Sequence, residues 1–364
     1  MHNRRLLFGL GIGALLLTLT WGLAGGGART AAQSSFAAQV AALSEPAGYF
    51  DTDNLISNER SYLDVVPDLK KRGVKGGAYV GVGPDQNFSY IAAIRPDVAL
   101  IVDVRRDNLL LHLLFKSLFT LARTRVEYLA MLLGRPVPAD AEHWRDASLD
   151  KIVSQVETTV LDARAVTVLR TRVDEAITKN GVPLTREDFA TIDRFHRRFI
   201  EAGVGLRFQS TGRPPQSHYP TYRDLLLATD ALGEHSNYLA SEESFQFVKS
   251  MQQRDLVIPV VGDLSGPRAL AAIGSLLRQR GQRLSAFYAS NVEFYLFGDG
   301  RFDRFVGNLG GMPRAEHGVV IRSVFGRYAR YGGGSSSHLQ PVNELVTGFA
   351  KGRFRDYGDL IDGR

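Results

Sequence analysis

The stretch from Lys75 to Asn108 limits most strongly how this chain can fold. A short apolar segment, Ala78 to Val82, ends in a glycine-containing turn, and a helical segment from Phe88 to Ile94 follows. A second apolar segment, Val98 to Val102, then ends on Asp103. A strand, a glycine turn, a helix and a second strand that closes on an acid are typical of the nucleoside-binding half of a doubly wound α/β sheet. The sequence therefore predicts an α/β fold whose sheet is mostly parallel.

The glycine turn has two possible roles. Gly81 and Gly83 would let the backbone turn sharply and let a ligand approach the main chain closely. The pattern is incomplete, because Pro84 fixes the turn and the third glycine of GxGxxG is missing. Plain turn chemistry is the alternative to a ligand-binding loop. The spacing to Asp103, where a ribose hydroxyl pair would be held, favours the ligand loop.

The N-terminal residues 1–33 have the pattern of an export signal. Arg4 and Arg5 precede an uncharged apolar run from Leu6 to Ala24, and small residues follow. These are the three regions of a secretory signal peptide, and the order Asn3-Arg4-Arg5-Leu6 also resembles a twin-arginine signal. The run is long enough to span a bilayer, so an uncleaved membrane anchor is the alternative. We expect an exported protein, either periplasmic or held in the inner membrane by its N-terminus.

Composition excludes several classes of function. The chain has no cysteine, so it has neither a disulfide framework nor a thiolate metal site. Apolar residues make up 44% and charged residues 23%, which is ordinary for a globular protein. The net charge is +6, but the basic residues are spread along the chain. We therefore expect a small-molecule ligand, no nucleic-acid partner and no metal site.

Helical patterns dominate the middle of the chain. A linker over 34–50 leads into the main domain, 51–330. Arg105 and Arg106 leave the second strand in opposite directions, so one of them would face the pocket. A long apolar helix is expected from Leu109 to Gly134, and a helical insertion over about 136–202 interrupts the α/β domain. The insertion is predicted to contain three helices: Leu149–Asp162, Ala165–Lys179 and Arg186–Glu201.

Later strands also end on polar residues. We expect a short strand over Gly205–Gln209, then a proline-rich loop that carries His218 and Tyr219. Two further strands end at Asp263 and at Ser290-Asn291, and another covers Gly318–Phe325. Residues 331–364 are expected to form a Gly/Ser linker and a helical tail. In an open α/β sheet the ligand crevice lies outside the carboxyl ends of the strands, so these polar ends predict one shared site.

The strand-end motifs resemble those of class I S-adenosylmethionine-dependent methyltransferases. The segments that carry the resemblance are YVGVGPDQN, VVGDL and YASNVEFYL. A closer resemblance is to a bacterial family of uncharacterised methyltransferase-like proteins, over roughly residues 50–135 and 205–325. The segments that look like this family are SNERSY, GVGPDQNFSYIAAIRPDVALIVDVRRDN and NYLASEESFQFVKSMQQRDLVIPVVGDLSG. The resemblance implies a Rossmann-like sheet. It also implies that Asp103 binds ribose hydroxyls and that Asp263 lies near the adenine.

The first functional hypothesis is therefore an exported protein that transfers a methyl group from S-adenosylmethionine to an unknown acceptor. The candidates for facing the acceptor are Asn291, Glu293, His218 and Tyr219, and methyl transfer can proceed by proximity and orientation without a base. The Asp85–Asn87 cluster, which replaces the third glycine, could bind the methionine part of the cofactor or fill the pocket. The proposed cofactor-binding residues are Gly81, Gly83, Asp85, Gln86, Asn87, Asp103, Arg105, Asp263 and Asn291.

Two other functions stay open. An exported, non-catalytic protein could use the same crevice to bind another ligand, and this hypothesis avoids the need for a cytoplasmic cofactor outside the cell. A hydrolase or metal enzyme is the third possibility. It has the least support, because the sequence contains neither GxSxG nor HExxH.

Overall fold

A six-stranded sheet organises the chain. The computed structural model describes residues 35–364 apart from residues 215, 330–333, 363 and 364. The strand order is β3-β2-β1-β4-β5-β6, in which the first five strands are parallel and β6 runs antiparallel to β5. The sequence prediction of an α/β fold with a mostly parallel sheet is confirmed. The direction of strand addition reverses between β1 and β4, which makes that point the switch point of the sheet.

The strands are β1 (Ala78–Val82), β2 (Val98–Asp103), β3 (Val257–Val261), β4 (Leu284–Ser290), β5 (Arg314–Phe325) and β6 (Ser335–Pro341). The helices before β3 are α1 (Phe36–Leu43), α2 (Val66–Lys71), α3 (Gln86–Ile94), α4 (Arg106–Leu121), α5 (Arg125–Leu132), α6 (Leu149–Thr158), α7 (Ala163–Lys179), α8 (Arg186–Ala202), α9 (Tyr222–Leu226) and α10 (Glu242–Gln253). The later ones are α11 (Ala269–Gln279), α12 (Val292–Gly298), α13 (Phe302–Gly310), α14 (Val342–Ala350) and α15 (Tyr357–Asp362). Short 3₁₀ turns cover Ala141–Trp144, Gly203–Gly205 and Gly326–Tyr328.

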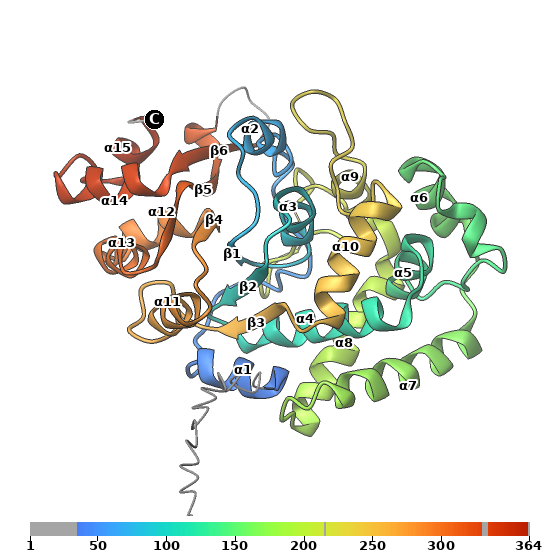
Figure 1. Cartoon of the computed structure of the whole chain (residues 1–364). Coiled ribbons are helices and arrows are strands. Elements are labelled where there is room, and N and C mark those ends of the chain that lie inside the picture. The colour runs from blue at the N-terminus through green and yellow to red at the C-terminus, as the bar shows by residue number, and fades with distance from the viewer. Residues whose placement is uncertain (1–34, 215, 330–333, 363–364) are drawn as a thin grey trace, which may run out of the picture. The chain divides into compact units, whose positions relative to one another are not determined.

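Helices cover both faces of the sheet. Helices α3, α4 and α10 lie on one side of it, and α11 and α13 lie on the other (Figure 1). Every residue of β1 and β3 is buried, as expected for parallel strands that are covered on both faces. This arrangement leaves the carboxyl ends of the strands as the edge at which loops can form a site.

The segments expected to be linkers pack as part of this fold. The prediction of a linker over 34–50 is wrong for its first half, because Phe36, Val40 and Leu43 of α1 are buried. Ser35 caps α1 by accepting a hydrogen bond from the Ala38 amide. The Gly/Ser linker and tail expected over 331–364 is likewise wrong for 335–341, which forms β6 in register with β5. A run of serines has little β propensity, and the cross-strand pairing with β5 overrides it.

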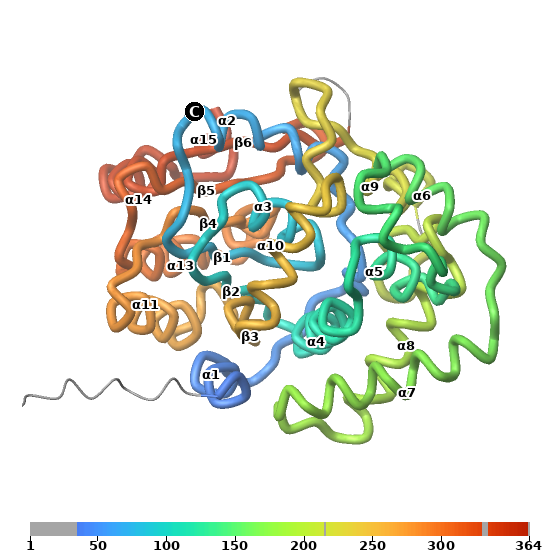
Figure 2. Tube along the Cα trace, turned by 45° about the vertical axis from the view of Figure 1, so that its right-hand side comes forward, coloured from blue at the N-terminus to red at the C-terminus, as the bar shows by residue number. Residues whose placement is uncertain are grey.

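The helical insertion has the three helices that the sequence predicts. Helices α6, α7 and α8 follow one another between α5 and β3, and α7 and α8 pack against α4 (Figure 2). The long helix expected from Leu109 to Gly134 is divided in two. Helix α4 ends at Leu121, where Ala122 takes an extended conformation, and α5 begins after Thr124, whose hydroxyl accepts from the Glu127 amide. The strand expected over Gly205–Gln209 is wrong, since this segment contributes only an isolated bridge between Arg207 and Thr221.

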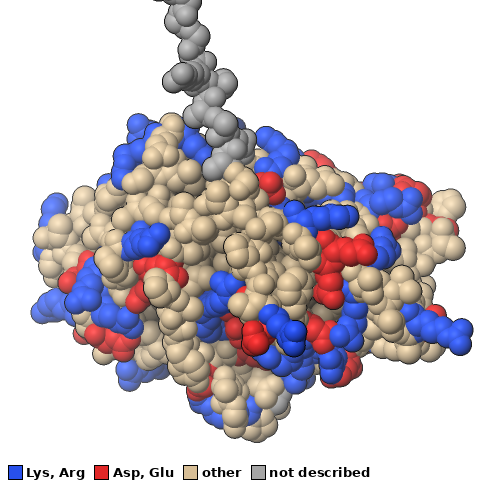
Figure 3. All heavy atoms as spheres, turned by 90° about the horizontal axis from the view of Figure 1, so that it is seen from below, with Lys and Arg blue, Asp and Glu red and all other residues tan. Residues whose placement is uncertain are grey.

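Charged side chains are mixed on the surface. Figure 3 shows lysine and arginine interspersed with aspartate and glutamate over the face in view, with no large area of one sign. No helix among residues 35–364, in the parts that are described, is long and apolar enough to span a bilayer. The predicted export signal over 1–33 lies outside the described residues.

Candidate functional site

The glycine turn after β1 is filled by a side chain. The Asn87 amide nitrogen donates to the carbonyl oxygens of Val82, Gly83 and Pro84, and its Oδ1 accepts a hydrogen bond of 2.7 Å from the Tyr79 hydroxyl. A Cβ on Gly81 would lie 2.0 Å from that Oδ1, so the absent side chain makes room for Asn87. Of the two roles open for the Asp85–Asn87 cluster, Asn87 therefore fills the turn.

The acid at the end of β2 has a cationic partner. Arg105 donates from Nε to Asp103 Oδ1 at 3.0 Å and from Nη2 to Oδ2 at 2.8 Å. The two side chains are only 8% and 10% exposed, and Arg105 also donates to the Thr52 carbonyl. Arg106 turns away and pairs with Asp188 of α8. The two arginines do point in opposite directions, and the one beside the strand end neutralises Asp103.

Asp263, beyond β3, is held in a similar way. Its Oδ1 accepts hydrogen bonds of 2.8 Å from the Ser265 amide and hydroxyl, and its Oδ2 pairs with Arg301 at 2.9 Å. The segment runs beside the end of β2, because the Gly262 amide donates to the Asp103 carbonyl. The structure thus places the two predicted acids at adjacent strand ends, each with its own arginine.

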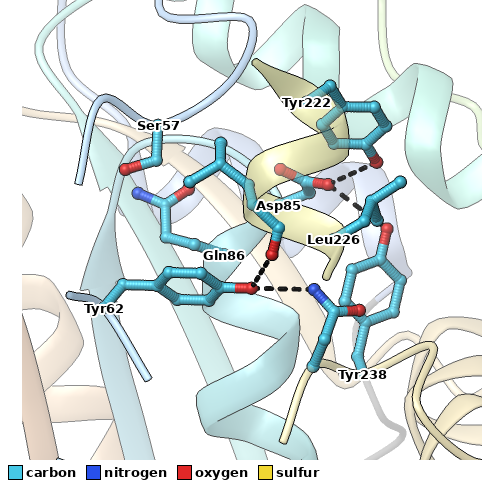
Figure 4. Close-up of a pocket in the computed structure, with 9 residues that line it drawn as sticks. Ser57, Tyr62, Asp85, Gln86, Tyr222, Leu226 and Tyr238 are labelled. Carbon is cyan, nitrogen blue, oxygen red and sulfur yellow. Dashed lines mark hydrogen bonds between the residues drawn. The ribbon is translucent and has the colours of Figure 1, made fainter. Parts of the chain in front are cut away.

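Asp85 lies in a buried polar cluster at the start of α3. Its Oδ2 accepts hydrogen bonds from the hydroxyls of Tyr222, at 2.8 Å, and Tyr238, at 3.3 Å (Figure 4). No cation pairs with this carboxyl among the described residues. Burial therefore raises the pKa of Asp85 to about 6, and the two tyrosine hydrogen bonds only partly oppose the rise.

A small cavity of about 10 Å³ adjoins this cluster, near the least volume that holds one water molecule. Tyr62 and Asn237 also line it, and the Asn237 amide donates to the Tyr62 hydroxyl at 2.8 Å. Gln86 also lines the cavity, and its Oε1 is buried without a partner among the described residues. The cavity is too small for an organic ligand.

A hydrogen-bond chain leads from this cluster to the switch point. The Gln86 amide donates to the Tyr288 hydroxyl at 3.1 Å, and that hydroxyl donates to Glu59 Oε2 at 2.6 Å. Glu59 also accepts from the hydroxyls of Ser323, at 2.5 Å, and Ser290. Three hydroxyls from β4 and β5 therefore converge on one carboxyl.

Glu59 is a buried acid without a cation. Its side chain is 1% exposed, and no lysine or arginine of the described chain pairs with it. Desolvation raises the pKa of Glu59, and the hydrogen bonds from Ser290, Ser323 and Tyr288 work in the opposite direction. A buried carboxyl with a raised pKa, held by several donors, is the kind of group that enzymes use to accept and return a proton.

A large cleft opens beside Glu59, and we call it the aromatic cleft. Its volume is about 620 Å³, within the range of small-molecule sites. Asn58 and Arg60 line it on either side of Glu59 in the sequence, and Asn291 lines it directly after β4. The lining residues are Asn58, Arg60, His218, Tyr219, Pro220, Asn291, Phe294, Tyr295, Phe325, Gly326, Arg327, Tyr328, Gly334, Ser335 and Tyr357.

The charged side chains that line the aromatic cleft, among the described residues, are all positive. Arg60 and Arg327 supply two guanidinium groups, and no aspartate or glutamate is found among the described lining residues. Arg60 lies 3.5 Å from Asp224 outside the lining, whereas Arg327 lies over the Tyr328 ring and donates to its hydroxyl at 2.8 Å. The cleft therefore favours an anionic group.

Three of the four residues predicted to face an acceptor line this cleft: His218, Tyr219 and Asn291. Glu293 does not, because it is 1% exposed and forms a buried ion pair with Arg322. Its Oε2 accepts from Arg322 Nε at 2.5 Å and its Oε1 accepts from Nη2 at 3.0 Å. The structure thus buries Glu293 inside the fold, paired with Arg322 of β5.

The proposed cofactor residues do not form a single site with the cleft. Asn291 lines it, but Gly81, Asp103 and Asp263 lie at the ends of β1 to β3 and contact the side chains described above. No group of three or more potential metal ligands occurs among the residues that the structure describes.

Most residues of the aromatic cleft are not evident from the sequence. Phe294 and Tyr295 belong to α12 and Tyr357 to α15, and none of these three aromatic residues was singled out as a ligand contact. Arg60 lies within SNERSY, but neither Arg60 nor Arg327 was predicted to contact a ligand, and Ser335 lay in the segment expected to be a linker. The strand-end rule located Ser290-Asn291.

The family model that matches this chain is the domain of unknown function DUF7790, over residues 54–180 and 210–350. The chain belongs to this family. The match includes β1 to β6 and the segments that line the aromatic cleft on the side of Glu59 and β4, and it leaves out the whole of α8. No curated protein matches the chain.

Proposed function

We propose that this member of the DUF7790 family binds a small molecule with a ring and an anionic group in the aromatic cleft. The observation that carries the proposal is the lining itself, in which aromatic side chains and two arginines occur without a carboxylate among the described residues. Clefts of this size that combine apolar walls with a few polar groups are typical small-molecule sites.

Each type of lining residue has a distinct role in this proposal. Phe294 and Tyr295 are 48% and 40% exposed and offer ring faces against which a planar or saturated ring can pack. Arg60 and Arg327 present planar guanidinium groups that suit a carboxylate, sulfonate or phosphate. Asn58 and Asn291 supply amides that would fix the orientation of the ligand.

We place this binding outside the cytoplasm. The support is the signal-like pattern of residues 1–33, with an N-terminal anchor in the inner membrane as the alternative. An exported binding protein needs no cofactor that is made inside the cell.

Titration with 8-anilinonaphthalene-1-sulfonate tests the proposal, because this dye combines aromatic rings with an anionic group and fluoresces in apolar surroundings. We expect saturable binding of one dye per folded chain. Arg327→Ala should weaken it about fivefold, which corresponds to about 1 kcal/mol. The matched control is Arg304→Ala, an exposed arginine on α13 outside the cleft. Absence of saturable binding, or equal affinity of the Arg327→Ala variant, would contradict the proposal.

Methyl transfer from S-adenosylmethionine is a second candidate, favoured by the parallel order β3-β2-β1-β4-β5 and by the glycine turn after β1. Asp103 already accepts three hydrogen bonds from Arg105, through the main-chain amide, Nε and Nη2. The hydroxyls of a ribose would have to compete with these bonds for the Asp103 oxygens, so we rank this function second. Calorimetric titration with S-adenosylmethionine and S-adenosylhomocysteine tests it. Micromolar binding that is lost in Asp103→Ala would support methyl transfer, and no heat of binding to the folded protein would exclude it.

A further inference from the structure

Ser290 has an unusual backbone conformation at the point where β4 gives way to α12. Its φ is +52°, a region that residues with a side chain seldom adopt. Such strain is found most often at functional sites, where the surrounding structure holds it in place. A serine on a tight, strained turn from a strand into a helix is the geometry that presents a nucleophilic hydroxyl at the end of a sheet. Tyr288 and Val292 stand where GxSxG would have glycines, so the sequence motif does not reveal this turn.

The Ser290 hydroxyl donates a hydrogen bond to Glu59 Oε1. The other oxygen of Glu59 accepts from the hydroxyls of Tyr288, at 2.6 Å, and Ser323, at 2.5 Å. A hydroxyl within hydrogen-bond reach of a base, with that base oriented by further groups, is the diagnostic arrangement of an activated nucleophile. No cation among the described residues competes for the carboxylate.

The pair lies at the boundary of the aromatic cleft. Glu59 is buried whereas Ser290 is half-buried. Asn58, which precedes Glu59, and Asn291, which follows Ser290, both line the cleft. A second route joins Glu59 to the cleft through hydroxyl groups: Ser323 contacts Ser337 at 3.2 Å, Ser337 contacts Ser61 at 3.2 Å, and Ser61 contacts Ser335 in the cleft wall at 3.0 Å. Both the hydroxyl and the proton acceptor are thus connected to the proposed ligand site.

We infer that Ser290 and Glu59 are a nucleophile and its general base, and that they hydrolyse a carboxylic ester bound in the aromatic cleft. This inference rests on the proposed function for the class of substrate, an ester that carries a ring and an anionic group. It adds a reaction to a site for which the proposed function requires binding alone.

The reaction balances with water as the second substrate. The Ser290 oxygen attacks the ester carbonyl carbon while its proton moves to Glu59. The bond from that carbon to the leaving oxygen then breaks, and the alcohol departs with the proton from Glu59. Water attacks the resulting acyl-serine and gives a proton to Glu59, the bond to Ser290 breaks, and the serine oxygen recovers the proton. The products are one carboxylic acid and one alcohol.

Fluorophosphonate labelling of the purified full-length chain, mapped by mass spectrometry, tests the inference. We expect one adduct, on Ser290, formed with loss of fluoride. Ser290→Ala should abolish labelling, and Glu59→Gln should slow it about 100-fold. The labelling rate of the wild type should also rise with pH as Glu59 ionises, which a merely structural glutamate would not cause. Matched controls are Ser275→Ala on α11, where the serine is half-buried as Ser290 is, and Glu243→Gln on α10, where the glutamate is exposed.

A measurement on the wild type alone guards against a Glu59 variant that does not fold. Saturating 8-anilinonaphthalene-1-sulfonate should protect Ser290 from labelling if the serine opens into the aromatic cleft. A folded protein that binds the dye but leaves Ser290 unlabelled overturns the inference while the proposed function stands. If Ser290 is labelled but the dye does not bind, the proposed class of ligand is wrong, whereas the assignment of Ser290 as nucleophile and Glu59 as base is retained.

Discussion

Asp85 gives the structure a pH dependence that one substitution removes. The carboxyl is buried, and it accepts side-chain hydrogen bonds from the hydroxyls of Tyr222 and Tyr238 but has no cationic partner among the described residues. Asp85→Asn keeps the shape of the side chain and an oxygen that can accept from one of these tyrosines, but it cannot ionise. The comparison between wild type and this variant therefore isolates the cost of ionising a buried group.

The magnitude follows from the pKa of Asp85, which is about 6 in the folded chain against the ordinary value of 3.8. Below pH 3.8 the carboxyl is protonated in both states, so its contribution to stability is fully present. Between these values the folded state binds the proton and the unfolded state does not, so stability falls as the pH rises. Above pH 6 the loss is complete and amounts to about 3 kcal/mol.

Urea unfolding followed by circular dichroism between pH 4 and pH 7.5 measures this effect. The free energy of unfolding of Asp85→Asn, relative to wild type, should increase by up to about 3 kcal/mol across that range. Asp303→Asn is the matched control, because Asp303 is exposed on α13. A difference between Asp85→Asn and wild type that stays constant with pH would refute the reasoning.

Two further predictions concern the switch-point edge. Ser290→Gly should be more stable than Ser290→Ala by about 1 kcal/mol, because both lose the hydroxyl but only glycine adopts a φ of +52° without strain. Equal urea midpoints for the two variants would show that the turn is not strained. Glu293→Gln should lower the free energy of unfolding by about 3–5 kcal/mol, since it leaves the Arg322 guanidinium buried without its anion. Glu243→Gln, at an exposed ion pair with Arg95, should change stability by less than about 1 kcal/mol, and a similar small change for Glu293→Gln would contradict the buried pair.

The central part of the fold was predictable because local sequence determines it. The apolar segments of β1 and β2 read as strands buried on both faces, and the glycine turn between β1 and α3 marks the start of the helix. The errors lie where tertiary contacts override local preference. The serine-rich β6 forms only because β5 is beside it, and α1 was mistaken for a linker because its few apolar residues are separated by small ones.

The candidate site was predictable only in part, for a related reason. The rule that ligands bind at the carboxyl ends of strands pointed to Asn291, and the loop that carries His218 and Tyr219 reaches the same cleft. The sequence could not show that Arg105 would form an ion pair with Asp103 or that Glu293 would form one with Arg322. Both ion pairs depend on the direction in which the side chains point. Glu59 accepts hydrogen bonds from Ser290 and Ser323, which lie more than 200 residues away in the sequence. No local sequence pattern predicts these contacts.

The most direct test of where this protein binds its ligand is amide hydrogen exchange with and without 8-anilinonaphthalene-1-sulfonate. If the aromatic cleft is the site, the dye should slow exchange in residues 57–61, 290–295 and 325–328 and leave 81–88 and 103–106 unchanged. Protection confined to the ends of β1 and β2, with no change around Asn291 and Arg327, would contradict this account. It would show that the ligand binds at the glycine turn after β1.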